Sequence, residues 1–307
     1  MSAHLMPAEP ALARWMSALP DERMLNQLTL PGSHDTCAYT VDDSLARTQG
    51  ATLTEQLAHG VRVLDIRCRH EDDVFHINHA RIALGLMFDD VIADCAGFLA
   101  QHPSECIVMS VKDECGTRAC TRSFEATFEA YLVRYPEVRW YLGNTTPCLA
   151  DVRGSIVLLR RFESATPLGI DLSAWPDNST FDLDIEGAAF TIQDEFRVPV
   201  RVSMEYKWRV IEALLARTPQ LSAARWVLNF CSGTGMAANP HAVACGDQAV
   251  RGMNERFTER INERINEQPG QHDGPAGTVM IDFCEHDDWA LVRALVARNP
   301  LQIMPAG

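Results

Sequence analysis

The chain is poor in positive charge, with only two lysines, Lys112 and Lys207, among its 307 residues. Lys and Arg together number 27 against 41 Asp and Glu, so the formal net charge is -14 at pH 7. A protein that binds nucleic acid needs a basic face to neutralise phosphates. The charge therefore excludes nucleic acid as a partner, and it argues against broad electrostatic adhesion to an anionic membrane.

Long apolar runs and targeting signals are also lacking. No run is long enough to cross a bilayer, so we expect no transmembrane segment. Residues 1–15 carry prolines and charges instead of a basic start and an apolar core, so no signal peptide is expected. The ten cysteines lack the close paired spacings of zinc sites. Cys115 with Cys120 and Cys231 with Cys245 could form loop disulfides, and the redox compartment stays open.

The order of apolar segments predicts one α/β domain over residues 1–307, with residues 1–23 as a helical lead-in. About eight predicted strands alternate with helices, which is typical of a (β/α)8 barrel. We expect the barrel to be distorted or incomplete, because residues 162–188 look irregular and one helix is missing there. The predicted strands span residues 25–30, 61–69, 74–77, 106–111, 155–159, 189–193, 226–230 and 278–281.

The first predicted strand ends in a polar turn. Pro31 and Gly32 are expected to stop it, because proline lacks a donor and glycine tolerates positive φ. Ser33, His34 and Asp35 follow at once. A single histidine in a turn is more often a surface residue than a catalyst, so this stretch needs partners from elsewhere in the chain.

Other titratable residues occupy the same position relative to their strands. In a (β/α)8 barrel the active site gathers at the C-terminal ends of the strands, because the loops there surround one mouth. The residues at or just past such ends are His34, Asp65, Arg67, His79, Lys112, Arg161, Asp194 and Asp282. The sequence therefore predicts an active site at the C-terminal mouth of the barrel.

This set of side chains suits one kind of chemistry. His34 and His79 can serve as general base and general acid near neutral pH. Asp282 could orient one histidine and Asp35 the other. Arg67 offers a rigid fork of donors for a phosphate. The pattern indicates in-line displacement at a phosphodiester, and Lys112, Arg161 and Asp194 remain to bind a polyhydroxylated group.

Several motifs also resemble those of the bacterial phosphatidylinositol-specific phospholipases C. They occur in order along nearly the whole chain: Leu30–Asp35, Gly60–Arg67, His79, Met109–Lys112, Ile156–Arg161, Trp175–Asn178, Thr191–Asp194 and Asn229–Phe230. The resemblance implies a distorted barrel and a metal-independent lyase that releases diacylglycerol and inositol 1,2-cyclic phosphate.

The resemblance also implies a role for each residue. His34, held by Asp282, would take the proton of the inositol 2-hydroxyl, and His79, backed by Asp35, would protonate the departing diacylglycerol oxygen. Arg67, held by Asp65, would stabilise the phosphate. The inositol hydroxyls would be bound by Lys112, Arg161 and Asp194, and Phe196 stands where the family has a tyrosine that stacks on the ring.

No metal cofactor is expected. The calcium-dependent eukaryotic relatives have acidic ligands where this chain has Arg67 and Lys112, and a cation cannot ligate calcium. Calcium is the less favoured alternative, with Asp35, Asp65 and Asp113 as its conceivable ligands.

Membrane contact is where the chain departs from the family. The rim tryptophans of well-known members are not evident, since the loops after the first and seventh strands have Arg47 and Met236. The segment 84–88 is either an alternative apolar rim or a turn that packs inward.

Three functions remain open. The first is a lyase that acts as a monomer on phosphatidylinositol at a membrane surface. The second is a calcium-dependent phosphodiesterase that acts on another phospholipid or on a glycerophosphodiester, and the third is an inactive barrel that binds inositol phospholipid. The family suggests a secreted or periplasmic protein, and the missing signal peptide keeps a cytoplasmic one possible.

Overall fold

A computed structural model describes residues 12–267 and 274–299 of the chain. Its strands are β1 Leu30–Ser33, β2 Val63–Glu71, β3 Val74–His79, β4 Ile82–Met87, β5 Ile107–Arg118, β6 Arg139–Tyr141, β7 Ser155–Arg161, β8 Ile170–Asp171, β9 Thr180–Ile185, β10 Ala188–Gln193, β11 Trp226–Phe230 and β12 Thr278–Ile281. Its helices are the 3₁₀ turns η1 Trp15–Ala18 and η2 Leu25–Gln27, and α2 Leu53–Ala58, α3 Phe88–Gln101, α4 Phe124–Arg134, α5 Leu149–Val152, α6 Ser203–Leu221, α7 Pro240–Cys245, α8 Met253–Glu267 and α9 His286–Ala297.

The strands form one curved sheet in the order β6-β7-β5-β2-β1-β12-β11-β10-β9. All neighbours from β6 to β10 pair in parallel, and β9 pairs antiparallel with β10. Among the described residues no backbone pairing joins β6 or β8 to β9, so the barrel stays open between them. This confirms the predicted incomplete barrel.

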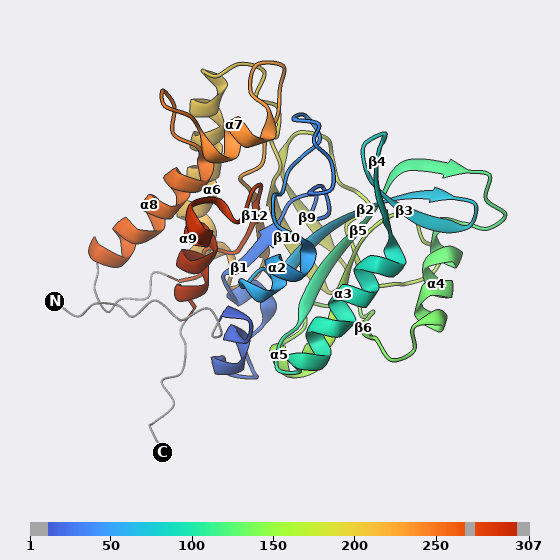
Figure 1. Ribbon diagram of the computed structural model, residues 1–307. Coiled ribbons are helices and arrows are strands. Elements are labelled where there is room, and N and C mark those ends of the chain that lie inside the picture. The colour runs from blue at the N-terminus through green and yellow to red at the C-terminus, as the bar shows by residue number, and fades with distance from the viewer. Residues whose placement is uncertain (1–11, 268–273, 300–307) are drawn as a thin grey trace.

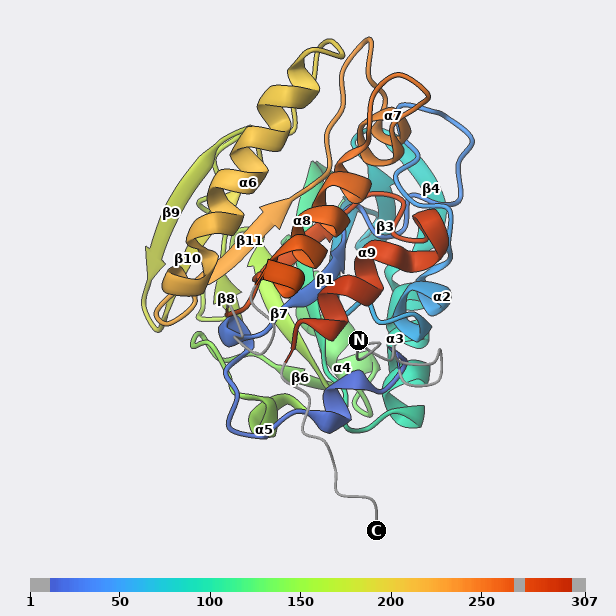
Figure 2. The ribbon, with the colours of Figure 1, turned by 90° about the vertical axis from the view of Figure 1, so that its left-hand side faces the viewer.

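Helices cover the outside of the sheet. Figures 1 and 2 show α6, α8 and α9 on one side of the molecule and α3 and α4 on the opposite side. In α8 the expected core stripe is confirmed for Met253, Phe257 and Ile261, all buried; Ile265 lies outside the described side chains. None of the helices in the described residues has both the length and the apolar character needed to cross a bilayer.

The prediction that Pro31 and Gly32 end the first strand is wrong. Both residues lie inside β1, and the strand starts only at Leu30 because Leu25–Gln27 form a 3₁₀ turn. Gly32 is needed because of a close approach: an added Cβ would lie 2.5 Å from Met280 Sδ and 3.0 Å from Val63 Cβ. The strand thus runs on to Ser33, directly before His34.

The third predicted strand is also not a barrel strand. β3 pairs antiparallel with β2 and with β4, so it belongs to an extension of the barrel wall. Of the two interpretations of segment 84–88, inward packing is the one that the structure supports, because Leu84 and Phe88 are buried. The extension still matters for the site, since β3 ends at His79.

The region between β7 and β10 has no helix, as predicted, and all of its residues are described. The strands β8 and β9 within it were missed, as were β4 and β6. At the start of the chain, Leu12, Trp15, Met16 and Leu19 share the predicted buried face. The part of the lead-in before residue 12 lies outside the described residues.

A buried ion pair fastens this lead-in to the bottom of the barrel. Arg62 and Glu105 are both fully buried and lie 2.8 Å apart. The Arg62 guanidinium also donates to the backbone oxygens of Leu12 and Ala13, and Glu105 accepts from the Met16 and Ser17 amides. Burial lowers the pKa of Arg62, with Glu105 acting in the opposite direction.

Glu105→Gln should lower the free energy of unfolding by about 3 kcal/mol, because it leaves the buried guanidinium without a counter-charge. Chemical denaturation monitored by tryptophan fluorescence measures this. The matched control is Glu71→Gln, which removes an accessible partner of Arg69 and Arg118 and should cost less than about 1 kcal/mol. Equal losses in the two variants would contradict a special role for the buried pair.

Candidate active site

A polar cavity of ≈ 470 Å³ opens at the C-terminal ends of the strands. Eight of the ten predicted site residues line it, and the other two, Asp35 and Asp65, are buried beneath and contact the lining residues. The lining residues are His34, Thr48, Arg67, His79, Ala80, Lys112, Glu114, Arg161, Trp175, Pro176, Asp177, Asp194, Phe196, Gly233, Thr234, Pro240 and Asp282.

Strand register brings the ends of β1, β2 and β12 together. Ser33 pairs with Ile281, so the next residues, His34 and Asp282, also come side by side. On the other flank Ser33 pairs with Leu64, and the Asp65 backbone carbonyl accepts from the Thr36 amide at 3.1 Å. The turn after β1 is therefore fixed from both neighbouring strands.

The hydrogen bonds of His34 define its protonation. Its Nδ1 lies 2.7 Å from Asp282 Oδ1, and its Nε2 lies 2.7 Å from Arg67 Nη2. A guanidinium can only donate, so Nε2 accepts and carries no proton. Nδ1 therefore holds the ring proton and donates it to Asp282. This neutral tautomer has its basic nitrogen on the side of Arg67.

Burial and neighbouring charges act in opposite directions on the pKa values of His34, Asp282 and Asp65. Burial lowers the pKa of His34, but the Asp282 carboxylate outweighs it and the net pKa is raised. Burial raises the pKa of Asp282, and His34 only partly offsets this. For Asp65, burial alone would raise the pKa, but Arg67 and Arg161 hold it well below the usual range. Asp65 is thus a permanent anion under the cavity.

Arg67 lies at the centre of these contacts. Its Nε and Nη2 both lie 3.0 Å from Asp65 Oδ2, and its Nη1 lies 3.6 Å from Asp35 Oδ2. Despite burial, these carboxylates raise its pKa well above the usual value. The guanidinium is held by anions beneath it and faces the cavity, which suits it to bind a phosphate.

The second histidine reaches the cavity from the wall extension. His79 Nδ1 forms an ion pair with Asp35 Oδ2. The following residue, Ala80, has a φ of 47° and donates its amide to Glu114 Oε1 at 3.1 Å. His79 and His34 therefore line one cavity, each with its own buried carboxylate.

Three cations lie side by side on adjacent strands. Arg67 on β2 pairs in register with Lys112 on β5, and Lys112 pairs with Arg161 on β7. The Arg161 guanidinium stacks 3.8 Å from the Trp175 ring centre, and Trp175 Nε1 donates to Asp194 Oδ2 at 3.0 Å. This part of the cavity presents both donors and acceptors, which suits a polyhydroxylated group.

Glu114 and Trp175 are among the lining residues that had no predicted role. Glu114 Oε2 lies 2.5 Å from Lys112 Nζ, and Arg67 Nη1 lies 3.4 Å from Glu114 Oε1. The predicted strand ended at 111, whereas β5 continues to 118, and alternation along it puts residues 112 and 114 on one face. Asp113 alternates to the other face and accepts from the Gly116 amide.

The other lysine, Lys207 on α6, holds the end of β10 from behind. It is buried and donates to Gln193 Oε1 at 3.1 Å and to the Glu195 carbonyl at 2.9 Å. Burial lowers its pKa to about 8. Asp194 lies between these two acceptors, so Lys207 fixes the segment that carries Asp194 and Phe196 to the cavity. Its only sequence signal was the scarcity of lysine.

The arrangement can bind an anion beside a base and an acid. The chain is also similar to known proteins. Residues 25–162 match the family described as "Phosphatidylinositol-specific phospholipase C, X domain". The 1-phosphatidylinositol phosphodiesterase of Listeria monocytogenes is 32% identical over 257 residues, covering 80% of this chain and 74% of the relative.

A second relative is a 1-phosphatidylinositol phosphodiesterase of Staphylococcus aureus (strain Newman), 32% identical over 199 residues. That match covers 60% of this chain, and the chain spans 64% of the relative's length. A solved structure of a double mutant of the S. aureus phosphatidylinositol-specific phospholipase C superposes with a TM-score of 0.78 at 26% identity. It covers 96% of this chain and 100% of the other. The chain therefore belongs to the family of bacterial phosphatidylinositol-specific phospholipases C.

Proposed function

We propose that this protein is a phosphatidylinositol diacylglycerol-lyase that acts by general acid–base catalysis. The observation that carries the proposal is the neutral tautomer of His34, whose Nε2 accepts from Arg67 while Nδ1 donates to Asp282. It leaves a basic nitrogen next to the group suited to bind the phosphate. An inactive lipid-binding barrel would need neither this base nor a second histidine.

In the proposed reaction, His34 Nε2 takes the proton from the inositol 2-hydroxyl. The 2-oxygen then forms a bond to phosphorus while the bond from phosphorus to the glycerol oxygen breaks. His79 gives its proton to that leaving oxygen, so diacylglycerol departs and inositol 1,2-cyclic phosphate remains. Water can open the cyclic phosphate slowly with the two histidines in exchanged roles.

Each remaining residue of the cavity has a proposed task. Arg67, oriented by Asp65, stabilises the charge that develops on the phosphate oxygens. Asp35 orients His79 by pairing with its Nδ1, and Asp282 stabilises His34 when it becomes charged. Lys112, Arg161 and Asp194 bind the inositol hydroxyls, and Phe196 offers an apolar face to the ring.

We propose that no metal takes part. Calcium needs six to eight oxygen ligands, but the cavity presents the cations Arg67 and Lys112 beside its carboxylates. Of the three acids considered for calcium, Asp35 and Asp65 pair with Arg67, and Asp113 is bound to a turn amide away from the cavity. The residues do not fit a calcium ion, and Arg67 supplies positive charge there.

Incubation with phosphatidylinositol, with and without EDTA, tests this function by phosphorus NMR. The cyclic phosphate signal should appear at the same rate in both samples, because the proposed stabilising charge is a guanidinium. No turnover would overturn the lyase, and turnover that EDTA abolishes would favour a calcium-dependent phosphodiesterase.

His34→Ala and His79→Ala should each lower kcat by about 10²–10⁴-fold, since each removes one proton-transfer group. The thermal midpoints should stay close to that of the parent protein. His76→Ala is the matched control. His76 lies on the same strand as His79 but outside the described cavity lining, so the activity of this variant should equal that of the parent protein. A histidine variant that kept most of its rate would contradict the assigned role.

We also propose that the protein meets its lipid at a membrane through an apolar rim beside the cavity. Met236 is 101% exposed and Val202 is 81% exposed, and they follow β11 and β10. The two loops are joined, because the Ala237 amide donates to the Pro199 carbonyl. Phe196 and Thr234, from the same loops, line the cavity. The rim thus lies where a lipid headgroup would enter.

Val202→Asp should weaken binding to phosphatidylinositol vesicles and raise the apparent KM by about tenfold, since a charge replaces an apolar contact with lipid. Turnover of a soluble, short-chain substrate should not change. Val133→Asp on α4, where the valine is equally exposed but remote from the mouth, is the control. Equal effects of the two substitutions would refute the rim.

Three properties complete the proposal. Residues 1–307 are one domain, which is supported by the single sheet that carries the cavity. We propose that the protein acts as a monomer, and one chain supplies both histidines and Arg67 to the cavity. On the resemblance we propose a secreted or periplasmic enzyme; an enzyme found only in the cytoplasm would contradict export. The sequence left open loop disulfides between Cys115 and Cys120 and between Cys231 and Cys245, and in the structure all ten cysteines are free.

A further inference from the structure

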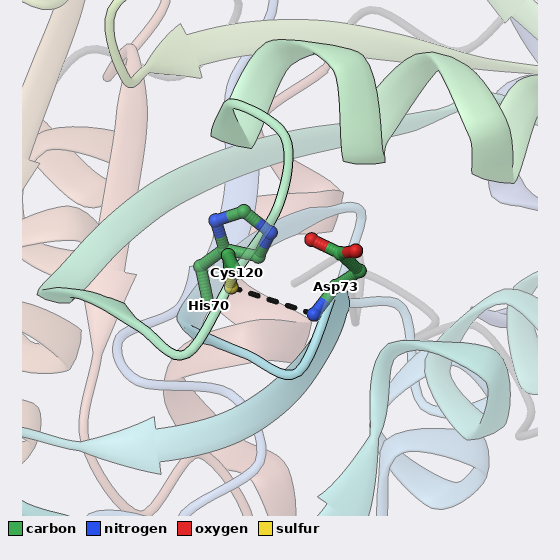
Figure 3. A group of neighbouring side chains, drawn as sticks. All are labelled: His70, Asp73 and Cys120. Carbon is green, nitrogen blue, oxygen red and sulfur yellow. Dashed lines mark hydrogen bonds between the residues drawn. The ribbon is translucent and has the colours of Figure 1, made fainter.

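Three potential metal ligands gather at the outer end of the wall extension, away from the catalytic cavity. They are His70 on β2, Asp73 in the turn between β2 and β3, and Cys120 just after β5 (Figure 3). Their ligand atoms lie within 4.8 Å of one another. None of the three belongs to the described lining of the catalytic cavity.

We propose that His70, Asp73 and Cys120 form a zinc site with water as the fourth ligand. Imidazole, thiolate and carboxylate together are donors that Zn²⁺ accepts, whereas Ca²⁺ and Mg²⁺ prefer oxygen alone. Three atoms that lie within 4.8 Å of one another have a common point no more than about 2.8 Å from each of them. Because Zn²⁺ bonds are about 2.0–2.3 Å long, each ligand atom would have to move toward that point by only about half an ångström.

The Asp73 carboxylate keeps a lone pair for the ion. Asp73 Oδ1 accepts from the amides of Thr121 and Arg122, while Oδ2 accepts only from the Thr121 hydroxyl. A carboxylate oxygen has two lone pairs, so Oδ2 has one left. The Arg122 guanidinium approaches the other oxygen, Oδ1, with its Nε 4.0 Å away.

Both ring nitrogens of His70 lie near a threonine hydroxyl. His70 Nε2 lies 2.8 Å from the Thr127 hydroxyl, whereas Nδ1 is 3.5 Å from the Thr117 hydroxyl, at the limit of a hydrogen bond. Whichever nitrogen takes the ion, the other keeps a threonine hydroxyl as an outer hydrogen-bond partner, as is usual for a histidine ligand.

The sulfur of Cys120 already has polar partners on both sides. The Asp73 amide donates to Cys120 Sγ at 3.4 Å, as the dashed line in Figure 3 shows, and the thiol donates to the Arg118 carbonyl at 3.3 Å. On binding Zn²⁺, the Cys120 proton is released to solvent and the sulfur–zinc bond forms with no redox change. The site would tie the β2–β3 turn to the segment after β5.

Zinc alone is the probe that tests the site. The metal-free full chain is titrated with Zn²⁺ in the presence of a chromophoric chelator, and one equivalent should bind. Cys120→Ser and Asp73→Asn should weaken binding by more than about tenfold, since they remove ligands themselves. Cys115→Ser, which removes an exposed thiol of the same strand end, should bind as the parent does.

Cobalt gives an independent reading of the geometry. Co²⁺ in the site should show a thiolate-to-metal charge-transfer band that Cys120→Ser lacks and Cys115→Ser retains. Equal zinc affinity in the parent and Cys120→Ser would overturn the proposal, as would no binding by the parent. Circular dichroism of the variants verifies that they are folded, so that lost binding reports the missing ligand.

Discussion

The buried carboxylate of Asp65 is the interaction on which the cavity depends. It lies in the wall between β1 and β5, and it binds Arg67 at 3.0 Å and the Asp35 amide at 3.2 Å. Arg161, two strands away, lies 3.6 Å from it. A buried anion is costly unless it is paired and hydrogen-bonded, so these groups are drawn to one point. Arg67 then fixes His34, and the turn after β1 presents Asp35 to His79.

Charge is consequently layered through the mouth. The carboxylates of Asp35 and Asp65 lie beneath the cavity, and the cations and histidines line it above them together with other acids such as Glu114 and Asp194. The substrate phosphate is proposed to meet that upper layer. Removing the anions would leave three cations in register on adjacent strands with nothing to offset their repulsion. The carboxylates that orient Arg67 therefore also offset the repulsion between Arg67 and the neighbouring cations.

Much of this could be predicted from the sequence, because the C-terminal ends of parallel strands converge wherever the strands lie in the sheet. His34 and Asp282 directly follow strand ends, and Arg67 and Lys112 lie where β2 and β5 pass the mouth before they continue into the wall extension. The register was not predictable, since it depends on contacts between distant segments: Gly32 looks like a strand breaker until Met280 and Val63 are seen against it. Glu114 was missed for a similar reason, as pairing with β2 extends β5 well beyond its apolar run.

The opening between β8 and β9 gives the mouth two parts that are held together differently, one by backbone pairing and the other by a side-chain hydrogen bond. The proposed base His34 and its partner Asp282 follow β1 and β12, where continuous backbone hydrogen bonds hold the strands. The proposed inositol end spans the opening instead, and a side-chain bond from Trp175 to Asp194 closes it. The width of the proposed headgroup pocket is thus set by side chains and not by backbone pairing. Under the proposed function, changes there would select among headgroups of different size without moving His34.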